Sequence, residues 1–461
     1  MEGVTAGEIR QWLDGQWTGE EADGVAPGGI STDTRSLKEG EAFLALRGPN
    51  FDGNRFVEEA FDRGACAAIA DSWEGSSLRP VLRVADAQKA LGEIAKQYRK
   101  RFDLPVIAIT GSAGKTTTKE MTAAVLGRTM RVLKTPESEN NEVGVPLTLL
   151  RLTSEVEAVV VELAARKAGD IRYLCEIAQP TIGVLLNIGT AHLEFFETVE
   201  GVAKAKGELL DYIGDKSSLA LVNVDDCVVA REVMRKKGRL LGFSLDSESH
   251  FCGEGLVLDQ EGRGHLSLQN IPIDLRIPGK HNVYNALAAA AVGDLCAVPA
   301  PEIGRALAEF EPASMRSEVV WKNDACLIKD CYNSNPGSAK AALDLLGEMQ
   351  LANGGRRIAA LGDMLELGES APELHAELGR QARSAGVELL LTCGPLSRST
   401  HLGAVEAGLE NSRHMENKAE LAVQLCAEVR PGDVVLVKAS RGAAFEEIVE
   451  RLLVSLQAGS L

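Results

Sequence analysis

The segment 110–120 combines residue types that can hold a nucleoside triphosphate. It reads Thr-Gly-Ser-Ala-Gly-Lys-Thr-Thr-Thr-Lys-Glu and directly follows the apolar run 106–109. This order predicts a strand, a glycine turn and the first turn of a helix, where backbone N–H groups and the helix dipole attract phosphate oxygens. Lys115 can reach the terminal phosphates, and Thr116 can ligate Mg²⁺.

The spacing of this loop is shorter than that of the general phosphate-loop pattern. The general pattern is G-x-x-x-x-G-K-[ST], whereas this chain has Gly111-x-x-Gly114-Lys115-Thr116. The alternative is an ordinary strand-to-helix turn without a ligand. A positive charge at a helix start opposes the helix dipole, however, so Lys115 needs an anion. We therefore predict phosphate contacts from Gly111, Ser112, Ala113, Gly114, Lys115, Thr116 and Thr117.

Two polar residues that follow later apolar runs could share a site with this loop. Glu162 closes the run 158–161, and His192 follows the run 181–186. Parallel sheets bind ligands beyond the carboxyl ends of their strands, so both side chains are expected near the phosphate loop. A carboxylate there is the expected second protein ligand of Mg²⁺. The alternatives are a solvated glutamate and a structural histidine, and spacing alone leaves His192 undecided.

Lys206 occupies an unusual place for a charged residue. In the predicted helix 199–213 it lies on the same face as Val202, Leu209 and Ile213. A buried ammonium is costly unless it is paired or chemically modified. The alternative is that the aliphatic stem packs on the core while the ammonium reaches water, and the pattern alone favours that alternative.

Two polar clusters lie later in the chain. The segment 279–285 opens an alanine-rich helix, with Asn282 and Asn285 three residues apart on one face. The segment 330–336 contains two further asparagines and follows a short apolar stretch. Both clusters could contact a nucleotide. Without a ligand, Asn282 would be a helix N-cap, and the second cluster would be a turn before a helix capped by Ser338.

Composition restricts the classes of function. The chain has 461 residues, of which 45% are hydrophobic and 25% charged, and this is typical of a soluble globular protein with about three domains. The net charge of −17 argues against nucleic acid or an anionic membrane as a partner. The sequence predicts no membrane span and no signal peptide. The nine cysteines form no C-x-x-C pair, so reduced thiols in the cytoplasm are expected.

Helix and strand patterns divide the chain into three α/β segments. Residues 1–86 alternate short strands and helices. Residues 87–313 contain the phosphate loop and strands that are apolar on both faces, which predicts a parallel sheet covered by helices. Residues 314–461 alternate strands and helices as a dinucleotide-binding fold does, but the G-x-G-x-x-G motif is absent. The expected strands include 42–46, 158–161, 358–361 and 434–437.

Together these segments resemble the Mur ligases, the ATP-dependent enzymes that form amide bonds in peptidoglycan assembly. The resemblance covers nearly the whole chain, and the short glycine spacing is the family's own. It implies a small N-terminal domain that binds the UDP-linked substrate, a central phosphate-loop ATPase domain, and a Rossmann-like C-terminal domain that binds the incoming dipeptide and part of ATP. The segments 140–146, 330–336, 361–368 and 438–441 are most similar to the branch that joins D-alanyl-D-alanine to UDP-N-acetylmuramoyl-tripeptide.

The resemblance also implies a catalytic set and two Mg²⁺ ions. Lys115 would hold the β- and γ-phosphates of ATP. Thr116 and Glu162 would bind a first Mg²⁺. His192 and Lys206 would bind a second, with Lys206 carbamylated by CO₂. Carbamylation turns a buried ammonium into a carboxylate, which would resolve the difficulty of its burial.

The remaining contacts implied by the resemblance fall into two groups, and the enzyme is expected to act as a cytoplasmic monomer. Further ATP contacts would come from His281, Asn282, Asn285, Arg316 and Asp330. Substrate contacts would come from Ser31, Thr32, Asp33, Thr34, Arg35, Asp52, Gly53, Asn140, Asn141, Asn333, Asn335, Lys438, Ser440 and Arg441. Three places depart from the family pattern: Ser138 replaces an asparagine, Leu163-Ala164 replaces Met-Gly, and Ala439 replaces a glycine.

Other activities share parts of this pattern. Mur ligases that add the third residue usually carry an Asp-Asn-Pro-Arg motif, which this chain lacks. A folyl-polyglutamate ligase stays open as an alternative within the enzymes. A GTP-dependent switch protein would need a guanine-reading Asn-Lys-x-Asp motif, which is also absent. A catalytically inactive scaffold would have no need to keep Lys115, Thr116, Glu162 and His192 together.

Overall fold

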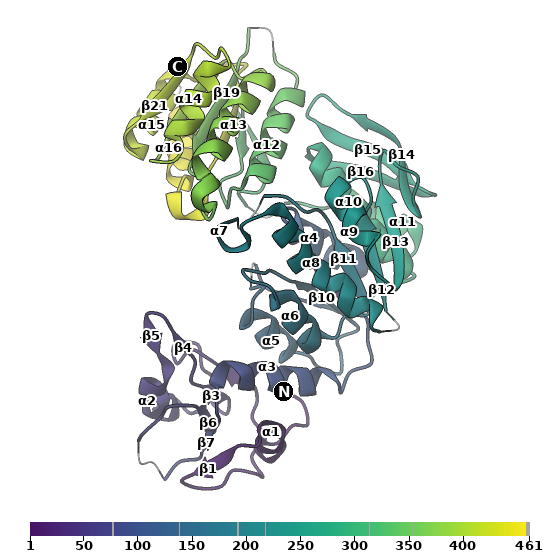
Figure 1. Ribbon diagram of the computed structural model, residues 1–461, viewed down its shortest axis with the longest axis vertical. Helices are drawn as coiled ribbons and strands as arrows, with labels where there is room; N and C mark the ends of the chain where they lie inside the picture. Colours follow the sequence, from purple (N-terminus) through teal and green to yellow (C-terminus); the bar gives the residue numbers. More distant parts are fainter. Residues whose placement is uncertain are drawn as a thin grey trace.

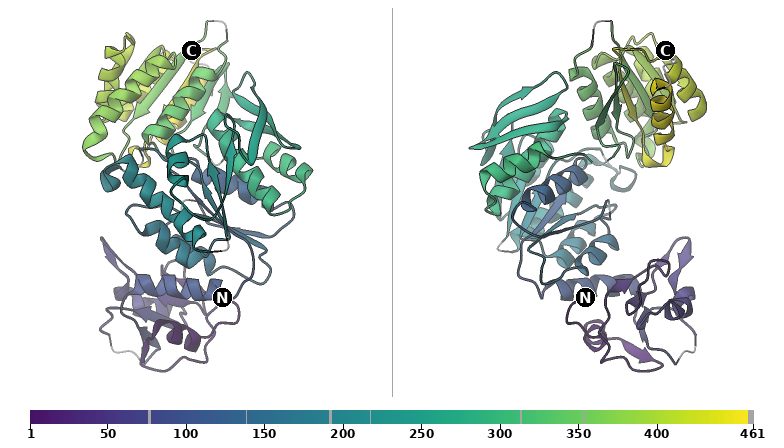
Figure 2. Two further views of the ribbon diagram at one scale, coloured as in Figure 1. Left: turned by 45° about the vertical axis from the view of Figure 1, so that its right-hand side comes forward. Right: turned by 180° about the vertical axis from the view of Figure 1, so that it is seen from behind.

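The chain folds into three α/β domains that follow one another in space as they do in sequence. The computed structural model describes residues 1–75, 78–137, 139–190, 193–216, 218–312, 314–352 and 354–457. The N-terminal and C-terminal domains lie at opposite ends of the central domain (Figures 1 and 2). No helix among the described residues combines the length and apolarity needed to cross a membrane. The predicted boundaries at 86/87 and 313/314 stay predictions.

The N-terminal domain contains a five-stranded sheet. Its strand order is β1 (Gln16–Thr18), β7 (Val81–Arg83), β6 (Ala67–Ala70), β3 (Ala42–Leu44) and β2 (Ile30–Ser31), with only β1 antiparallel to its neighbour. Strand β3 is shorter than the predicted 42–46 because the chain turns there into the hairpin β4 (Arg47–Gly48) and β5 (Phe51–Asp52). The helices are α1 (Ala6–Leu13), η1 (Gly53–Phe56) and α2 (Val57–Asp62).

The central domain is built on a nine-stranded sheet. The order is β16 (Ile271–Pro278), β15 (Arg263–Leu268), β14 (Phe251–Leu258), β13 (Arg239–Ser244), β12 (Leu219–Asn223), β11 (Ile182–Leu185), β8 (Val106–Thr110), β10 (Ala158–Glu162) and β9 (Val132–Lys134). The strands from β9 to β14 are parallel, and β15 and β16 continue the sheet in antiparallel pairing. The carboxyl ends of β8, β10, β11 and β12 therefore share one edge.

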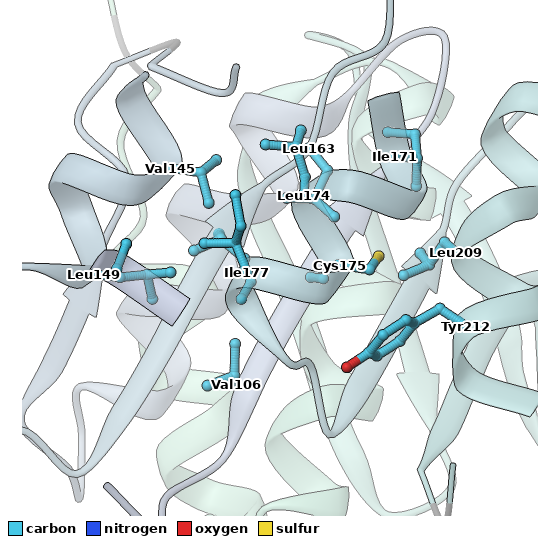
Figure 3. Packing of buried hydrophobic residues seen from close by; sticks show 14 of the residues in the cluster. Val106, Val145, Leu149, Leu163, Ile171, Leu174, Cys175, Ile177, Leu209 and Tyr212 are labelled. Carbon is cyan, nitrogen blue, oxygen red and sulfur yellow. The ribbon is translucent and has the colours of Figure 1, made fainter. Parts of the chain in front are cut away.

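Side chains of β8 alternate between two cores, as expected for a strand covered on both faces. Val106 and Ala108 pack into one cluster, and Ile107 and Ile109 pack into the other. Figure 3 shows part of the first cluster, which combines Val106 with helix residues such as Leu149 and Ile177. That face carries α3 (Ala87–Arg99), α5 (Gly144–Leu149), α6 (Asp170–Ala178), α8 (Val199–Gly214) and α9 (Cys227–Val233), and the other carries α4 (Lys115–Leu126), α10 (Lys280–Leu295) and α11 (Ala300–Ala308).

The C-terminal domain contains a six-stranded sheet with helices on both faces. The order is β17 (Glu318–Lys322), β18 (Ala325–Lys329), β22 (Val434–Lys438), β19 (Arg357–Gly362), β20 (Leu389–Cys393) and β21 (Ser412–Met415), and only β17 is antiparallel. The helices are α12 (Pro336–Glu348), η2 (Gly368–Ser370), α13 (Ala371–Ser384), α14 (Arg398–Glu406), α15 (Lys418–Glu428), η3 (Arg441–Ala443) and α16 (Glu446–Gln457).

Two helix starts differ from the expectations for an unliganded chain. Helix α12 is capped by Asn335 and not by Ser338, and the Ser338 backbone N–H donates to the Asn335 side chain at 2.9 Å. Asn282 is not an N-cap, because α10 begins at Lys280 after Gly279. In both places the true cap lies three residues before the predicted one: at α12 two neighbouring polar residues both satisfy the capping pattern, and at α10 the cap is a glycine without a side-chain hydrogen bond.

Lys119 holds the loop that follows β9 in place through hydrogen bonds. Its side chain is fully buried and its ammonium donates to the carbonyl oxygens of Thr135 at 2.7 Å and Glu137 at 2.5 Å. It also lies 3.1 Å from a Glu120 carboxylate oxygen. The loop continues to residues 140–142, which lie at the central site, so Lys119 ties this part of the site to α4.

We expect Lys119→Met to lower the free energy of unfolding by about 2–4 kcal/mol, because the buried Thr135 carbonyl and the partly buried Glu137 carbonyl lose their donor. Lys134→Met is a matched control, since Lys134 also pairs with Glu120 but is 44% exposed. The control should cost less than about 1 kcal/mol. Urea unfolding of both variants followed by circular dichroism checks this. Equal losses of unfolding free energy in the two variants would show that the hydrogen bonds from Lys119 to the two carbonyl groups do not stabilise the fold.

Candidate active site

A cavity of about 910 Å³ lies where the carboxyl edge of the central sheet meets the C-terminal domain. Most residues predicted from the sequence to bind ATP or substrate line it. They are Ser112, Ala113, Gly114, Lys115, Thr116, Thr117, Asn140, Asn141, Glu162, His281, Asn282, Asn285, Arg316, Asp330, Asn333, Asn335, Lys438, Ser440 and Arg441. The sheet therefore brings together side chains that lie far apart in the sequence.

The phosphate loop is shaped by a glycine that no other residue can replace without strain. Gly114 has φ of 79°, and a Cβ placed there would lie 2.4 Å from Asn285 Oδ1. Asn187, at the end of β11, fastens the loop from the other side: its Oδ1 accepts from the Ala113 N–H at 2.8 Å, and its Nδ2 donates to the Ala113 carbonyl at 3.1 Å. The backbone N–H groups at the start of α4 are thus held ready for an anion.

Lys115 stands at the start of α4, and no carboxylate of the described residues is in hydrogen-bond contact with its ammonium. Its ammonium donates to the Gly111 carbonyl at 2.9 Å. Burial lowers the pKa of Lys115, the Glu162 carboxylate opposes this, and the charge of Arg316 adds to it. A bound polyphosphate would relieve this cost, because it would supply the missing negative charge.

Thr116, Glu162 and Asn140 form a compact oxygen-rich group beside the loop. The Thr116 hydroxyl donates to Glu162 Oε2 at 2.8 Å, and Asn140 Nδ2 donates to Glu162 Oε1 at 2.7 Å. The described residues contain no cluster of three or more His, Cys, Asp or Glu side chains placed to chelate a metal. A hydroxyl and a carboxylate beside a phosphate site fit Mg²⁺, which takes few protein ligands and fills its sphere with phosphate oxygens and water.

Lys206 is buried in α8, with only 2% of its surface exposed. Its pKa lies well below the ordinary value because of burial and then because of the charge of Lys115, while Glu162 acts in the opposite direction. No residue in the described ranges accepts a hydrogen bond from its ammonium. An exposed fraction of 2% leaves the side chain little contact with water, which disfavours the alternative in which the ammonium reaches solvent. His192, its predicted partner at a second Mg²⁺, lies outside the described residues.

The predicted adenosine contacts lie in a network between α10 and α4. Asn285 Nδ2 donates to Asn282 Oδ1 at 3.1 Å, and the Thr118 hydroxyl donates to Asn285 Oδ1 at 3.1 Å. Burial lowers the pKa of His281, whose Nε2 lies 3.4 Å from the Ser317 hydroxyl. Two neutral amides and a neutral imidazole form a wall suited to an uncharged base and ribose rather than to phosphate.

The C-terminal domain contributes cations to the same cavity. The Lys438 ammonium donates to Asp330 Oδ2 at 2.6 Å, and the Ser317 N–H donates to Asp330 Oδ1 at 3.0 Å. The guanidinium carbon of Arg316 lies 3.8 Å from the centre of the Tyr332 ring, and that of Arg441 lies 5.6 Å from it. Tyr332 thus supports two cations at the cavity.

The predicted uridine-diphosphate contacts do not line this cavity. Ser31, Thr32, Asp33, Thr34, Arg35, Asp52 and Gly53 all belong to the N-terminal domain. Arg35 pairs with Asp33 at 2.6 Å, and Asp52 caps η1 by accepting from the Asn54 N–H at 3.0 Å. Their role in substrate binding stays a prediction.

Several cavity residues were missed by the sequence reasoning. Arg166, Lys167 and Asn223 line the cavity without having been proposed as contacts, and Tyr284 and Tyr332 line it within predicted clusters in which they were not singled out. Asn223 closes the apolar run 219–222, and a polar residue at the carboxyl end of a parallel strand was a usable signal. The arginine and lysine look like ordinary surface residues in the sequence, and nothing in their spacing points inward.

Comparison with known proteins assigns the chain to a family. Three family models match: "Mur ligase family, catalytic domain" over 28–99, "Mur ligase middle domain" over 109–293, and "Mur ligase, glutamate ligase domain" over 315–441. Proteins named UDP-N-acetylmuramoyl-tripeptide--D-alanyl-D-alanine ligase from Synechocystis and Bacillus subtilis are 35% and 33% identical. The first match covers 92% of this chain and 91% of the relative, and the second covers 98% of both.

Solved structures give the same assignment. A crystal structure of MurF from Acinetobacter baumannii superposes with a TM-score of 0.90 at 30% identity, covering 98% of both chains. MurF from Thermotoga maritima in complex with ADP superposes with a TM-score of 0.83 at 29% identity, covering 93% of this chain and 98% of that one. The fold, the phosphate-loop geometry and these full-length matches agree that the chain belongs to the Mur ligase family.

Proposed function

We propose that this chain joins D-alanyl-D-alanine to UDP-N-acetylmuramoyl-tripeptide with the conversion of ATP to ADP and phosphate. The observation that carries the proposal is a single cavity that combines the phosphate loop, the Thr116–Glu162 pair and cations of the C-terminal domain. Relatives of this name match the chain over nearly its full length, and one MurF relative was solved with ADP. The reaction would serve peptidoglycan precursor synthesis in the cytoplasm, with the enzyme acting as a monomer.

The chemistry follows from the inertness of a carboxylate at neutral pH. One oxygen of the tripeptide carboxylate attacks the γ-phosphorus of ATP, the bond to the β-phosphate oxygen breaks, and an acyl phosphate and ADP result. The amine of D-alanyl-D-alanine then attacks the acyl carbon, phosphate leaves, and the nitrogen loses a proton. The positive charges of Lys115 and Arg316 offset the repulsion between the tripeptide carboxylate and the ATP phosphates, which must approach each other in the first step.

Mg²⁺ would be held by Thr116 and Glu162, and a second ion by His192 and a carbamylated Lys206; bound there, these ions would withdraw charge from the phosphate oxygens. Around such ions, Asn140 orients the Glu162 carboxylate through its 2.7 Å hydrogen bond. Burial lowers the pKa of Lys206 well below its ordinary value and so favours the neutral amine, which is the form that adds to CO₂.

The first prediction concerns the phosphate site. Continued ADP release over many turnovers should require ATP, the UDP-linked tripeptide and D-alanyl-D-alanine together. Lys115→Met should lower turnover by about 100-fold or more, because the developing charge on the phosphate loses its partner. Lys204→Met, an exposed lysine of α8, is the control and should keep the original rate. A Lys115→Met enzyme with unchanged turnover would contradict the proposed site.

The second prediction concerns carbamylation of Lys206. Lys206→Ala should be inactive, and a short carboxylic acid such as acetate should restore part of the activity by standing in for the carbamate. Lys206→Arg keeps the charge and should not be restored. A carbamate signal should appear in the ¹³C NMR spectrum of the unmodified enzyme given labelled bicarbonate. Full activity of Lys206→Ala without any acid, or a spectrum without that signal, would reject the modification.

A further inference from the structure

Two cations on the loop after β10 have no part in the chemistry described above. Arg166 and Lys167 are exposed and line the cavity, a few residues beyond Glu162. Their backbone is well fixed: Asp170 Oδ2 accepts from the N–H of Arg166 at 2.9 Å and of Lys167 at 3.0 Å. Glu208 of α8 accepts from the Gly169 N–H at 2.7 Å. The two side chains therefore start from an anchored turn.

The other cations of the cavity already have partners or a role. Lys438 pairs with Asp330 at 2.6 Å. Arg316 and Arg441 lie against Tyr332, and Lys115 belongs to the phosphate loop. In contrast, Arg166 Nη2 lies 4.0 Å from Glu366 Oε1, and the Lys167 ammonium forms no ion pair with any residue in the described ranges. In a chain of net charge −17, these two weakly neutralised cations at the reaction site indicate an anionic ligand.

The chemistry of the acceptor supplies such a ligand. A structural relative from Acinetobacter baumannii, 30% identical with a TM-score of 0.84, is named UDP-N-acetylmuramoylalanyl-D-glutamyl-2,6-diaminopimelate--D-alanyl-D-alanyl ligase. An acceptor of that composition carries two carboxylates besides the one that forms the amide: one on the glutamyl residue and one on the side chain of the diaminopimelate. The ATP phosphates, by contrast, would occupy the loop around Lys115.

We propose that Arg166 and Lys167 bind a non-reacting carboxylate of the acceptor peptide and thereby select acceptors that carry it. This inference rests on the proposed function and adds to it the class of acceptor. A guanidinium and an ammonium on one anchored turn can both donate to a single carboxylate, and such charge-assisted hydrogen bonds are among the stronger polar contacts. The contact would also fix the direction in which the peptide enters the site.

Three acceptors and two double variants test the inference. The acceptors are the diaminopimelate peptide, a peptide with lysine in its place, and a peptide with isoglutamine in place of glutamate. The unmodified enzyme should show a kcat/KM about 10- to 100-fold lower for whichever acceptor lacks the bound carboxylate. That acceptor identifies the source of the carboxylate. Arg166→Gln/Lys167→Gln should use all three acceptors alike, with KM values for ATP and D-alanyl-D-alanine unchanged.

The matched control is Arg235→Gln/Lys237→Gln. It removes the same charge from exposed residues that precede β13, at the amino edge of the sheet and away from the cavity. This control should keep the discrimination of the unmodified enzyme. The inference is overturned if the unmodified enzyme treats the three acceptors alike, or if Arg166→Gln/Lys167→Gln keeps the original discrimination. It is also overturned if Arg166→Gln/Lys167→Gln loses as much affinity for UDP-N-acetylmuramic acid, which carries no peptide, as for the acceptor peptides. Lack of ADP release by the unmodified enzyme would reject the proposed function instead.

Discussion

The bend of the phosphate loop depends on how closely α10 approaches α4. Gly114 adopts a positive φ, and the space where a side chain would begin is filled by the amide of Asn285. Small residues of α10 allow this approach: the alanines at 286 and 288–291 are fully buried, and a Cβ on Gly293 would lie 2.5 Å from Val125 of α4. Small side chains let two helices pack at short range over the sheet. The loop's conformation is therefore set by helix packing as much as by the loop's own glycines.

The same packing places positive charge in a site that lacks enough negative charge to balance it. Burial lowers the pKa of both Lys115 and Lys206. A nearby positive charge lowers each pKa further: that of Arg316 for Lys115, and that of Lys115 for Lys206. Glu162 is the carboxylate that acts on both, and it is already engaged by Thr116 and Asn140. A site with such an excess of positive charge favours ligands that carry negatively charged oxygens. This excess of positive charge is the physical reason for proposing anionic ligands at the site of a strongly acidic protein.

Most of the fold and the phosphate-binding part of the site could be predicted from the sequence. Strands that are apolar on both faces identified the parallel sheet, and its carboxyl edge gathers Glu162, Asn187 and Asn223 as the rule for such sheets predicts. What failed were choices among neighbouring polar residues, as with the cap at Asn335, because each of them satisfies the same local pattern. The Tyr332 platform and the Arg166–Lys167 turn could not be foreseen, since they depend on contacts between segments far apart in the chain.

One departure from the family pattern shows how tertiary contacts absorb a local change. Ala439 replaces a glycine in the segment that follows β22, and it is fully buried. A Cβ on the neighbouring Gly362 would lie 2.8 Å from the Ala439 methyl, so the bare backbone at the end of β19 provides the space that this methyl needs. Ser440 still donates its hydroxyl to the Ser334 carbonyl at 3.1 Å and accepts from the Leu365 N–H at 3.0 Å. The segment therefore keeps its connections to both polar loops of the C-terminal domain, and the substitution leaves the cavity wall intact because its volume is accommodated on the side of the core.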